Sequence, residues 1–121
     1  MDMEWIPYVV WALVIVWLSR QLLPVRGIKH IDATELKRIR SDRNKQWIDV
    51  RTKGEYAAYH LSPFQNIPLH ELKKRSSELD KEKEVVLICQ SGMRSQKAAR
   101  ILKKQGFQRI TNVKGGLNAC K

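Results

Sequence analysis

A single cysteine stands where an apolar run meets a glycine- and serine-rich segment. Cys89 follows EVVLI and opens the segment CQSGMRS, after which QKAARILKKQG has the pattern of a helix. A cysteine thiolate is a strong nucleophile, and loop N–H groups followed by a helix N-terminus favour negative charge at such a position. We therefore predict that Cys89 is a nucleophilic thiol in an electropositive loop.

The residues after Cys89 fit the same chemistry. Gly92 gives the backbone freedom that a tight curl needs, and Arg94 adds a fixed positive charge with paired donors for an oxyanion. Serine hydroxyls in the loop are further donors, and Ser95 can also cap the helix. A free cysteine is often just a small buried apolar residue, but the glycine, the arginine and the helix start favour a functional thiol. The expected cradle around the sulfur consists of Gln90, Ser91, Gly92, Met93, Arg94 and Ser95.

Strand-like and helix-like segments alternate along the chain and would position this loop. Apolar runs predict strands at residues 46–50, around 67, at 85–88 and at 109–113. Helices are expected at 32–40, 52–59, 69–79 and 94–105, the first two opened by capping boxes and the last ended by Gly106, with a terminal turn or helix in GGLNAC. The alternation predicts an α/β domain with a parallel sheet. Ligands bind at the carboxyl ends of such strands, where Cys89 stands.

Four segments follow, in order, the motifs of a known family. DVRTKGEYAAYHL, QNIPLHEL, VVLICQSGMRS and VKGGLNAC resemble the rhodanese-like (thiosulfate sulfurtransferase) domains over about residues 28–120. The resemblance implies a five-stranded parallel sheet flanked by helices, with a persulfide carried on Cys89. It also implies that Asp49 and Arg51 lie beside the cysteine loop and support it, and that His60 stands at the rim in a structural role.

The loop spacing separates sulfur transfer from phosphatase chemistry. Phosphatase-like relatives use C-x5-R, whereas Cys89 and Arg94 make the shorter C-x4-R, which resembles the cradles that hold a persulfide sulfur. We expect transfer of sulfane sulfur from thiosulfate or a persulfide donor to a thiol or cyanide, without a metal or other cofactor. The alternative is a catalytically silent rhodanese-like interaction module. Cys120 stands where the family usually has tryptophan, and we interpret it as a packing residue and not as a resolving thiol.

An uncharged stretch near the N-terminus is of another kind. Residues 5–23 carry Arg20 as their only charge, and a spanning helix tolerates about 17 residues. This predicts a membrane anchor at 1–24 before a rhodanese-like domain at 25–121. A cleaved signal peptide and an amphipathic surface helix are the alternatives; the first lacks a basic start and a cleavage site, and the second lacks a polar face. Basic residues after the stretch predict a single-pass protein of the cell membrane with its C-terminal domain in the cytoplasm.

The expected domain is strongly basic. Residues 25–121 hold 22 Lys and Arg against 10 Asp and Glu, a formal net charge of +12. The charges are scattered and accompany no nucleic-acid-binding motif, so we expect contact with anionic head groups and no nucleic-acid partner. Two cysteines are too few for a disulfide framework or a zinc site.

Overall fold

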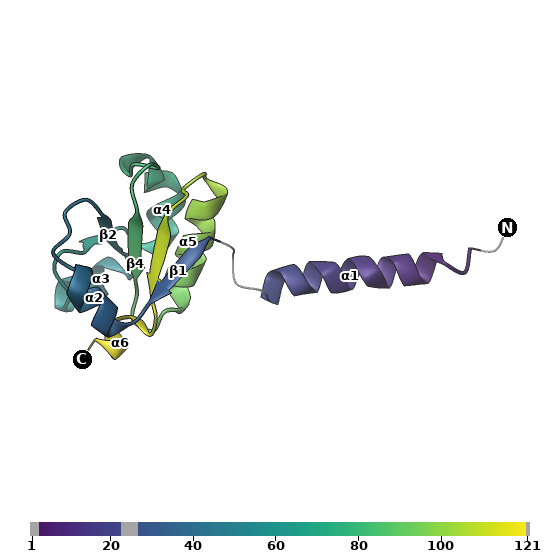
Figure 1. The fold of residues 1–121 in the computed structure, drawn as a ribbon, viewed down its shortest axis with the longest axis horizontal. Helices are drawn as coiled ribbons and strands as arrows, with labels where there is room; N and C mark the ends of the chain where they lie inside the picture. Colours follow the sequence, from purple (N-terminus) through teal and green to yellow (C-terminus); the bar gives the residue numbers. More distant parts are fainter. Residues whose placement is uncertain (1–2, 23–26, 121) are drawn as a thin grey trace.

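The structure is a computed structural model that describes residues 3–22 and 27–120 (Figure 1). Helices and strands alternate after a separate N-terminal helix. Their bounds are α1 Ile6–Leu22, β1 Ile28–Ile31, α2 Ala33–Ile39, β2 Gln46–Asp49, α3 Lys53–Ala58, β3 Gln65–Asn66, α4 Leu69–Arg75, a 3-10 turn Ser76–Glu78, β4 Val85–Ile88, α5 Met93–Lys104, β5 Ile110–Val113 and α6 Gly116–Ala119.

The strands form one five-stranded sheet in the order β1-β5-β4-β2-β3. Every strand pair is parallel, so the predicted α/β fold with a five-stranded parallel sheet is confirmed. The central strand β4 is buried along its whole length, as its unbroken apolar sequence predicts. Since all strands run the same way, the segments after β2, β4 and β5 meet at one edge of the sheet.

The strand β1 was not recognised from its sequence. Its residues IKHI place two adjacent polar side chains between two isoleucines and so lack the alternation of a half-buried strand. The sequence, with Pro24 and Gly27 close by, instead predicts a short linker over residues 25–28. Pairing with β5, in the register Ile28 with Ile110, is what makes it a strand. Ile28 thus belongs to β1 and not to the predicted linker, and residues 25 and 26 lie outside the described residues.

Helices cover both faces of the sheet (Figure 1). On one face Leu72 of α4 and Leu102 of α5 pack against Leu87 and Cys89. On the other, Leu36 of α2 and Leu117 of α6 pack against Trp47, Phe64, Val86 and Ile88. The thiol at the end of β4 therefore belongs to the face covered by α4 and α5.

Three predicted helix ends are confirmed, whereas the helix predicted at 69–79 ends at Arg75 and continues only as the 3-10 turn Ser76–Glu78. The Asp32 side chain accepts a hydrogen bond from the Glu35 N–H at the start of α2. Thr52 and Glu55 form a full capping box at the start of α3. Gly106 follows the end of α5 with φ of +97°, the left-handed conformation expected after a helix.

The N-terminal helix α1 is 17 residues long, uncharged from Ile6 to Ser19 and with Arg20 in its last turn. Its large apolar side chains, from Ile6 to Leu18, are exposed. Within residues 3–22 and 27–120, no helix has both the length and the apolar character needed to cross a membrane. The predicted membrane-spanning helix is therefore not supported, and its last residue, Leu23, lies outside the described residues.

Candidate active site

The thiol of Cys89 is enclosed by its own loop. It directly follows β4 and has no exposed surface. The Gly92 N–H donates a hydrogen bond to Sγ at 2.9 Å, and the Ser95 hydroxyl lies 3.4 Å from the same sulfur. The sulfur thus sits inside the curl of the loop, with a backbone amide directed at it.

Gly92 is required at the turn for two reasons. Its φ of +103° lies in the region that favours glycine, and a Cβ there would stand 3.2 Å from the backbone nitrogen of Gly115. The helix α5 begins directly after it at Met93. Ser95 therefore lies within the first turn, and the prediction that it caps the helix is wrong. Its hydroxyl instead donates to the Gly92 carbonyl at 3.0 Å and closes the loop.

The chain after β5 forms a second wall of the loop. The Leu117 N–H donates to the Cys89 carbonyl at 2.9 Å, and the Asn118 N–H donates to the Gln90 carbonyl at 3.0 Å. The side chains of Gln90 and Asn118 are also joined at 2.7 Å. At Gly116 a Cβ would collide with the Cys89 carbonyl oxygen. The motif GGLNAC therefore fixes the backbone that carries the thiol.

A buried ion pair supports the loop from the β2 side. Asp49 has no exposed surface and Arg51 is 2% exposed. Arg51 donates to the Asp49 carboxylate through Nε and Nη2, the latter at 2.8 Å. Its remaining donors reach the Tyr59 carbonyl at 2.7 Å and the Gln90 side chain at 3.4 Å. The structure thus places both supporting residues beside the cysteine loop, while their contribution to activity stays a prediction.

Arg94 is held by a carboxylate that sequence reasoning did not select. Its Nη1 and Nη2 donate to the two oxygens of Glu55 at 2.6 and 2.9 Å. These hydrogen bonds lower the pKa of Glu55 to about 2, against the desolvation of the carboxyl group, and raise the pKa of Arg94. The sequence shows Glu55 only as the third helical residue of a capping box, so nothing in it indicates a partner 39 positions away.

The other predicted residues lie at the surface. Ser91 and Met93 are exposed, Met93 by 72%. The imidazole of His60 stacks on Tyr56, with ring centroids 3.9 Å apart, and its Nδ1 lies 2.9 Å from the Tyr56 carbonyl. Within the described residues, His60 is therefore fixed to α3 and is not joined to Cys89 by a hydrogen bond, while its expected structural role stays a prediction.

The second cysteine lies on the far side of the sheet. Cys120 packs against the cluster under α2 and α6, whereas Cys89 belongs to the cluster under α4 and α5. Burial raises the pKa of the Cys120 thiol. This placement favours packing over a resolving role. In residues 3–22 and 27–120, no three His, Cys, Asp or Glu side chains are grouped as a metal site would need.

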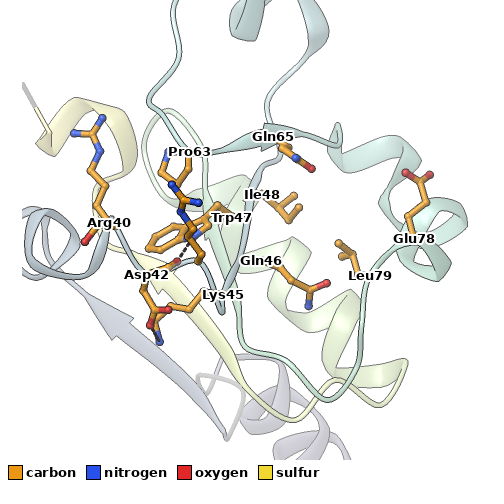
Figure 2. A pocket seen from close by; sticks show the side chains of 12 residues that line it. Arg40, Asp42, Lys45, Gln46, Trp47, Ile48, Pro63, Gln65, Glu78 and Leu79 are labelled. Carbon is orange, nitrogen blue, oxygen red and sulfur yellow. Dashed lines mark hydrogen bonds and ion pairs between the residues drawn. The ribbon is translucent and has the colours of Figure 1, made fainter.

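A cleft of about 550 Å³ lies away from the cysteine loop (Figure 2). It is lined by residues 40–43 and 45–48, from the segment before β2 and from β2 itself, and by Pro63, Gln65, Glu78 and Leu79. Figure 2 shows Trp47 and Ile48 near its middle, with Arg40 on one side and Glu78 and Leu79 on the other. None of its residues belongs to the loop 89–95, so this cleft does not hold the thiol chemistry.

Comparisons with known proteins agree on one family. A protein-family model described as "Rhodanese-like domain" matches residues 32–121. The chain is 42% identical over 81 residues to the putative sulfur carrier protein YrkF of Bacillus subtilis. The matched residues cover 67% of this chain and 44% of YrkF. It is 33% identical over 93 residues to a sulfurtransferase of Allochromatium vinosum, covering 76% of this chain and 87% of that protein.

Solved structures show the same likeness. A rhodanese-like domain protein from Staphylococcus aureus matches with a TM-score of 0.71 at 29% identity, covering 77% of this chain and 91% of that one. The chain spans less than half the length of YrkF, so the activity of that whole protein does not transfer to it directly.

Proposed function

Since the chain belongs to the rhodanese-like domain family, we propose that it is a sulfurtransferase that carries sulfane sulfur as a persulfide on Cys89. The observation that supports this most directly is the enclosed thiol. Its sulfur receives the Gly92 N–H at 2.9 Å at the start of α5, where backbone dipoles favour negative charge. The names of relatives, a sulfurtransferase and a putative sulfur carrier protein, point the same way.

In the first half-reaction the Cys89 thiolate attacks the outer sulfur of the donor. A sulfur–sulfur bond forms to Cys89, and the donor's own sulfur–sulfur bond breaks. The leaving group takes the electron pair, as sulfite from thiosulfate or as a thiolate from a persulfide. The new outer sulfur then lies within the loop 90–95, where backbone N–H groups stabilise its negative charge.

In the second half-reaction a thiol or cyanide removes that sulfur. The acceptor attacks the outer sulfur, the Cys89–sulfur bond breaks, and the Cys89 thiolate leaves with the electron pair. The two steps make a ping-pong cycle through a covalent intermediate. Because the nucleophile is a thiolate, the cycle needs no general base from the protein, and His60 has no proton to move.

The direct test is intact-protein mass spectrometry of the full chain after incubation with thiosulfate. We expect a gain of one sulfur that disappears when cyanide is added. A chain that gains no sulfur from thiosulfate or from a persulfide, while its thiols still react with an alkylating reagent under denaturing conditions, would contradict the proposal.

The complete burial of Cys89 favours a second candidate function, a silent interaction module of the same fold. In that case the thiol would serve only as a packing residue of the α4 and α5 face. Native alkylation separates the two candidates. A working thiol reacts with a small alkylating reagent in the folded protein, whereas a packing residue reacts only after unfolding.

We also propose that α1 holds the domain at the cytoplasmic face of a cell membrane. Its exposed apolar surface needs a cover. The last turns of α2, α4 and α5 carry Lys37, Arg38, Lys73, Lys74, Arg75, Lys103 and Lys104. These helices run against the strands, so their basic ends lie opposite Cys89, at the edge where β1 begins. That arrangement supports a leaflet on the basic side and an open active site on the other.

Vesicle flotation tests the membrane proposal. The full chain is expected to float with vesicles that contain anionic lipid, and substituting Val10→Lys and Ile15→Lys within α1 is expected to leave the protein in the soluble fraction. Equal flotation of both proteins, or none of either, would contradict a role for α1 in membrane association.

A further inference from the structure

Two arginines beside the Cys89 loop each have a carboxylate partner. Arg51 pairs with Asp49 inside the protein, and Arg94 pairs with Glu55 at its surface. The formal charge of these four groups sums to zero. Neither arginine therefore gives the loop an uncompensated positive charge, whereas the backbone dipoles at the start of α5 still favour an anion there.

The pair of Arg94 and Glu55 has a geometry that competes with anion binding. A carboxylate and a sulfonate-like group use the same paired N–H donors of a guanidinium. Glu55 already takes one donor from Nη1 and one from Nη2, at 2.6 and 2.9 Å. Within the described part of the chain, Arg94 makes no other hydrogen bond through its side chain. An anionic sulfur donor such as thiosulfate must therefore either displace Glu55 from Arg94 or bind near Arg94 while the Glu55 carboxylate stays beside it.

The carboxylate is firmly fixed, so displacement is costly. Glu55 Oε1 also accepts a hydrogen bond from the Thr52 N–H at 3.2 Å, which is part of the capping box of α3, and another from the Thr52 hydroxyl at 3.0 Å. The side chains of Glu55 and Arg94 are about one-third exposed, at 34% and 35%. A sulfur donor that approaches from solution therefore interacts with both charges at once.

We propose that Glu55 sets the choice of sulfur donor, disfavouring small dianions such as thiosulfate and favouring a persulfide carried on an uncharged thiol. This inference rests on the proposed sulfur transfer and names its substrate class. Thiosulfate carries two negative charges, and each is repelled by Glu55 as much as it is attracted by Arg94 at equal distance. The persulfide carries at most one negative charge, and its transfer needs only the loop amides.

The test compares two donors with one acceptor in the full-length protein. Steady-state rates are measured with thiosulfate and with 2-hydroxyethyl persulfide for the wild type, for Glu55→Gln and for Glu78→Gln. Glutamine keeps the capping box because its carbonyl oxygen can still accept from Thr52. Glu78 is a matched control, since it pairs with an arginine, Arg75, and lies on the cleft away from the loop.

Glu55→Gln is expected to lower KM for thiosulfate about three- to tenfold and to change KM for the persulfide much less. Glu78→Gln is expected to change neither value. Arg94→Ala is the opposite arm, because it leaves Glu55 unpaired: KM for thiosulfate should rise more than KM for the persulfide.

Two results would overturn the inference alone. If Glu55→Gln raises KM for thiosulfate, Glu55 holds Arg94 in place to bind the anion and does not compete with it. If KM changes equally for both donors, Glu55 acts on the fold of the site and not on donor choice. Failure of the wild type to accept sulfur from either donor would instead overturn the proposed function, and this inference with it.

Discussion

Cys89→Ser is expected to abolish sulfur transfer while the protein stays folded. The serine hydroxyl is not ionised at neutral pH and forms no persulfide, so the covalent intermediate is lost with the nucleophile. We expect the rate with either donor to fall by at least about a thousandfold, to the uncatalysed background, as for loss of a covalent nucleophile. Steady-state kinetics and intact mass, which should show no added sulfur on the variant, both measure this.

The fold should tolerate this change because the loop can satisfy a hydroxyl group. The Gly92 N–H that donates to Sγ can donate to Oγ, and the Ser95 hydroxyl lies beside it. The melting temperature should therefore stay within a few degrees of the wild type. Cys120→Ser is the matched control, since Cys120 lies against the opposite face of the sheet. If transfer activity survives Cys89→Ser but falls in Cys120→Ser, the nucleophile is Cys120 and the proposed role of Cys89 is wrong.

The parts of the fold that the sequence predicted correctly are governed by local rules. The strand VVLI is buried on both faces and so reads as continuously apolar, and the helix ends at Thr52 and Gly106 depend on residues within a few positions. β1 depends instead on pairing with β5, more than 80 positions away in the register Ile28 with Ile110. A four-residue segment whose two middle positions are polar carries too little local signal for that.

The site divides in the same way. The loop 89–95 is contiguous, so its cysteine, glycine and helix start could be found together in the sequence. The pair of Glu55 and Arg94 joins α3 to α5, and it exists only because β2 and β4 are neighbours in the sheet. The need for glycine at position 116 likewise comes from the close approach of the Cys89 carbonyl, a tertiary contact.

Arg94 shows how a correct residue can receive an incomplete role. Sequence reasoning gave it a free charge for an oxyanion, because arginine in such a loop has the right donors. The structure adds the carboxylate that occupies two of them. The chemistry of a site depends on the net charge of all its groups, and that sum requires the partners that the fold brings in.

Arg51→Met is expected to be the most destabilising substitution outside the sheet core. It removes the partner of Asp49, which has no exposed surface, and leaves a buried carboxylate with an uncompensated charge. Breaking a buried pair in this way costs about 3–5 kcal/mol of unfolding free energy. Arg51 also contacts the Gln90 side chain and the Tyr59 carbonyl, so persulfide formation at Cys89 should slow in the same variant. Urea unfolding of the full chain, followed by circular dichroism, measures the stability.

The double variant Asp49→Asn, Arg51→Met separates the charge from the packing. Removing both charges should recover most of the lost stability, because no uncompensated charge is then buried. The asparagine side chain at position 49 can still accept the hydrogen bond from the backbone N–H of residue 51, which donates to Asp49 Oδ1 at 3.0 Å in the wild type. Arg38→Met, in an exposed pair with Glu35, is the matched control and should leave the unfolding midpoint unchanged. If the double variant is as unstable as Arg51→Met, the arginine acts through its contacts to the loop and to α3 and not by neutralising Asp49.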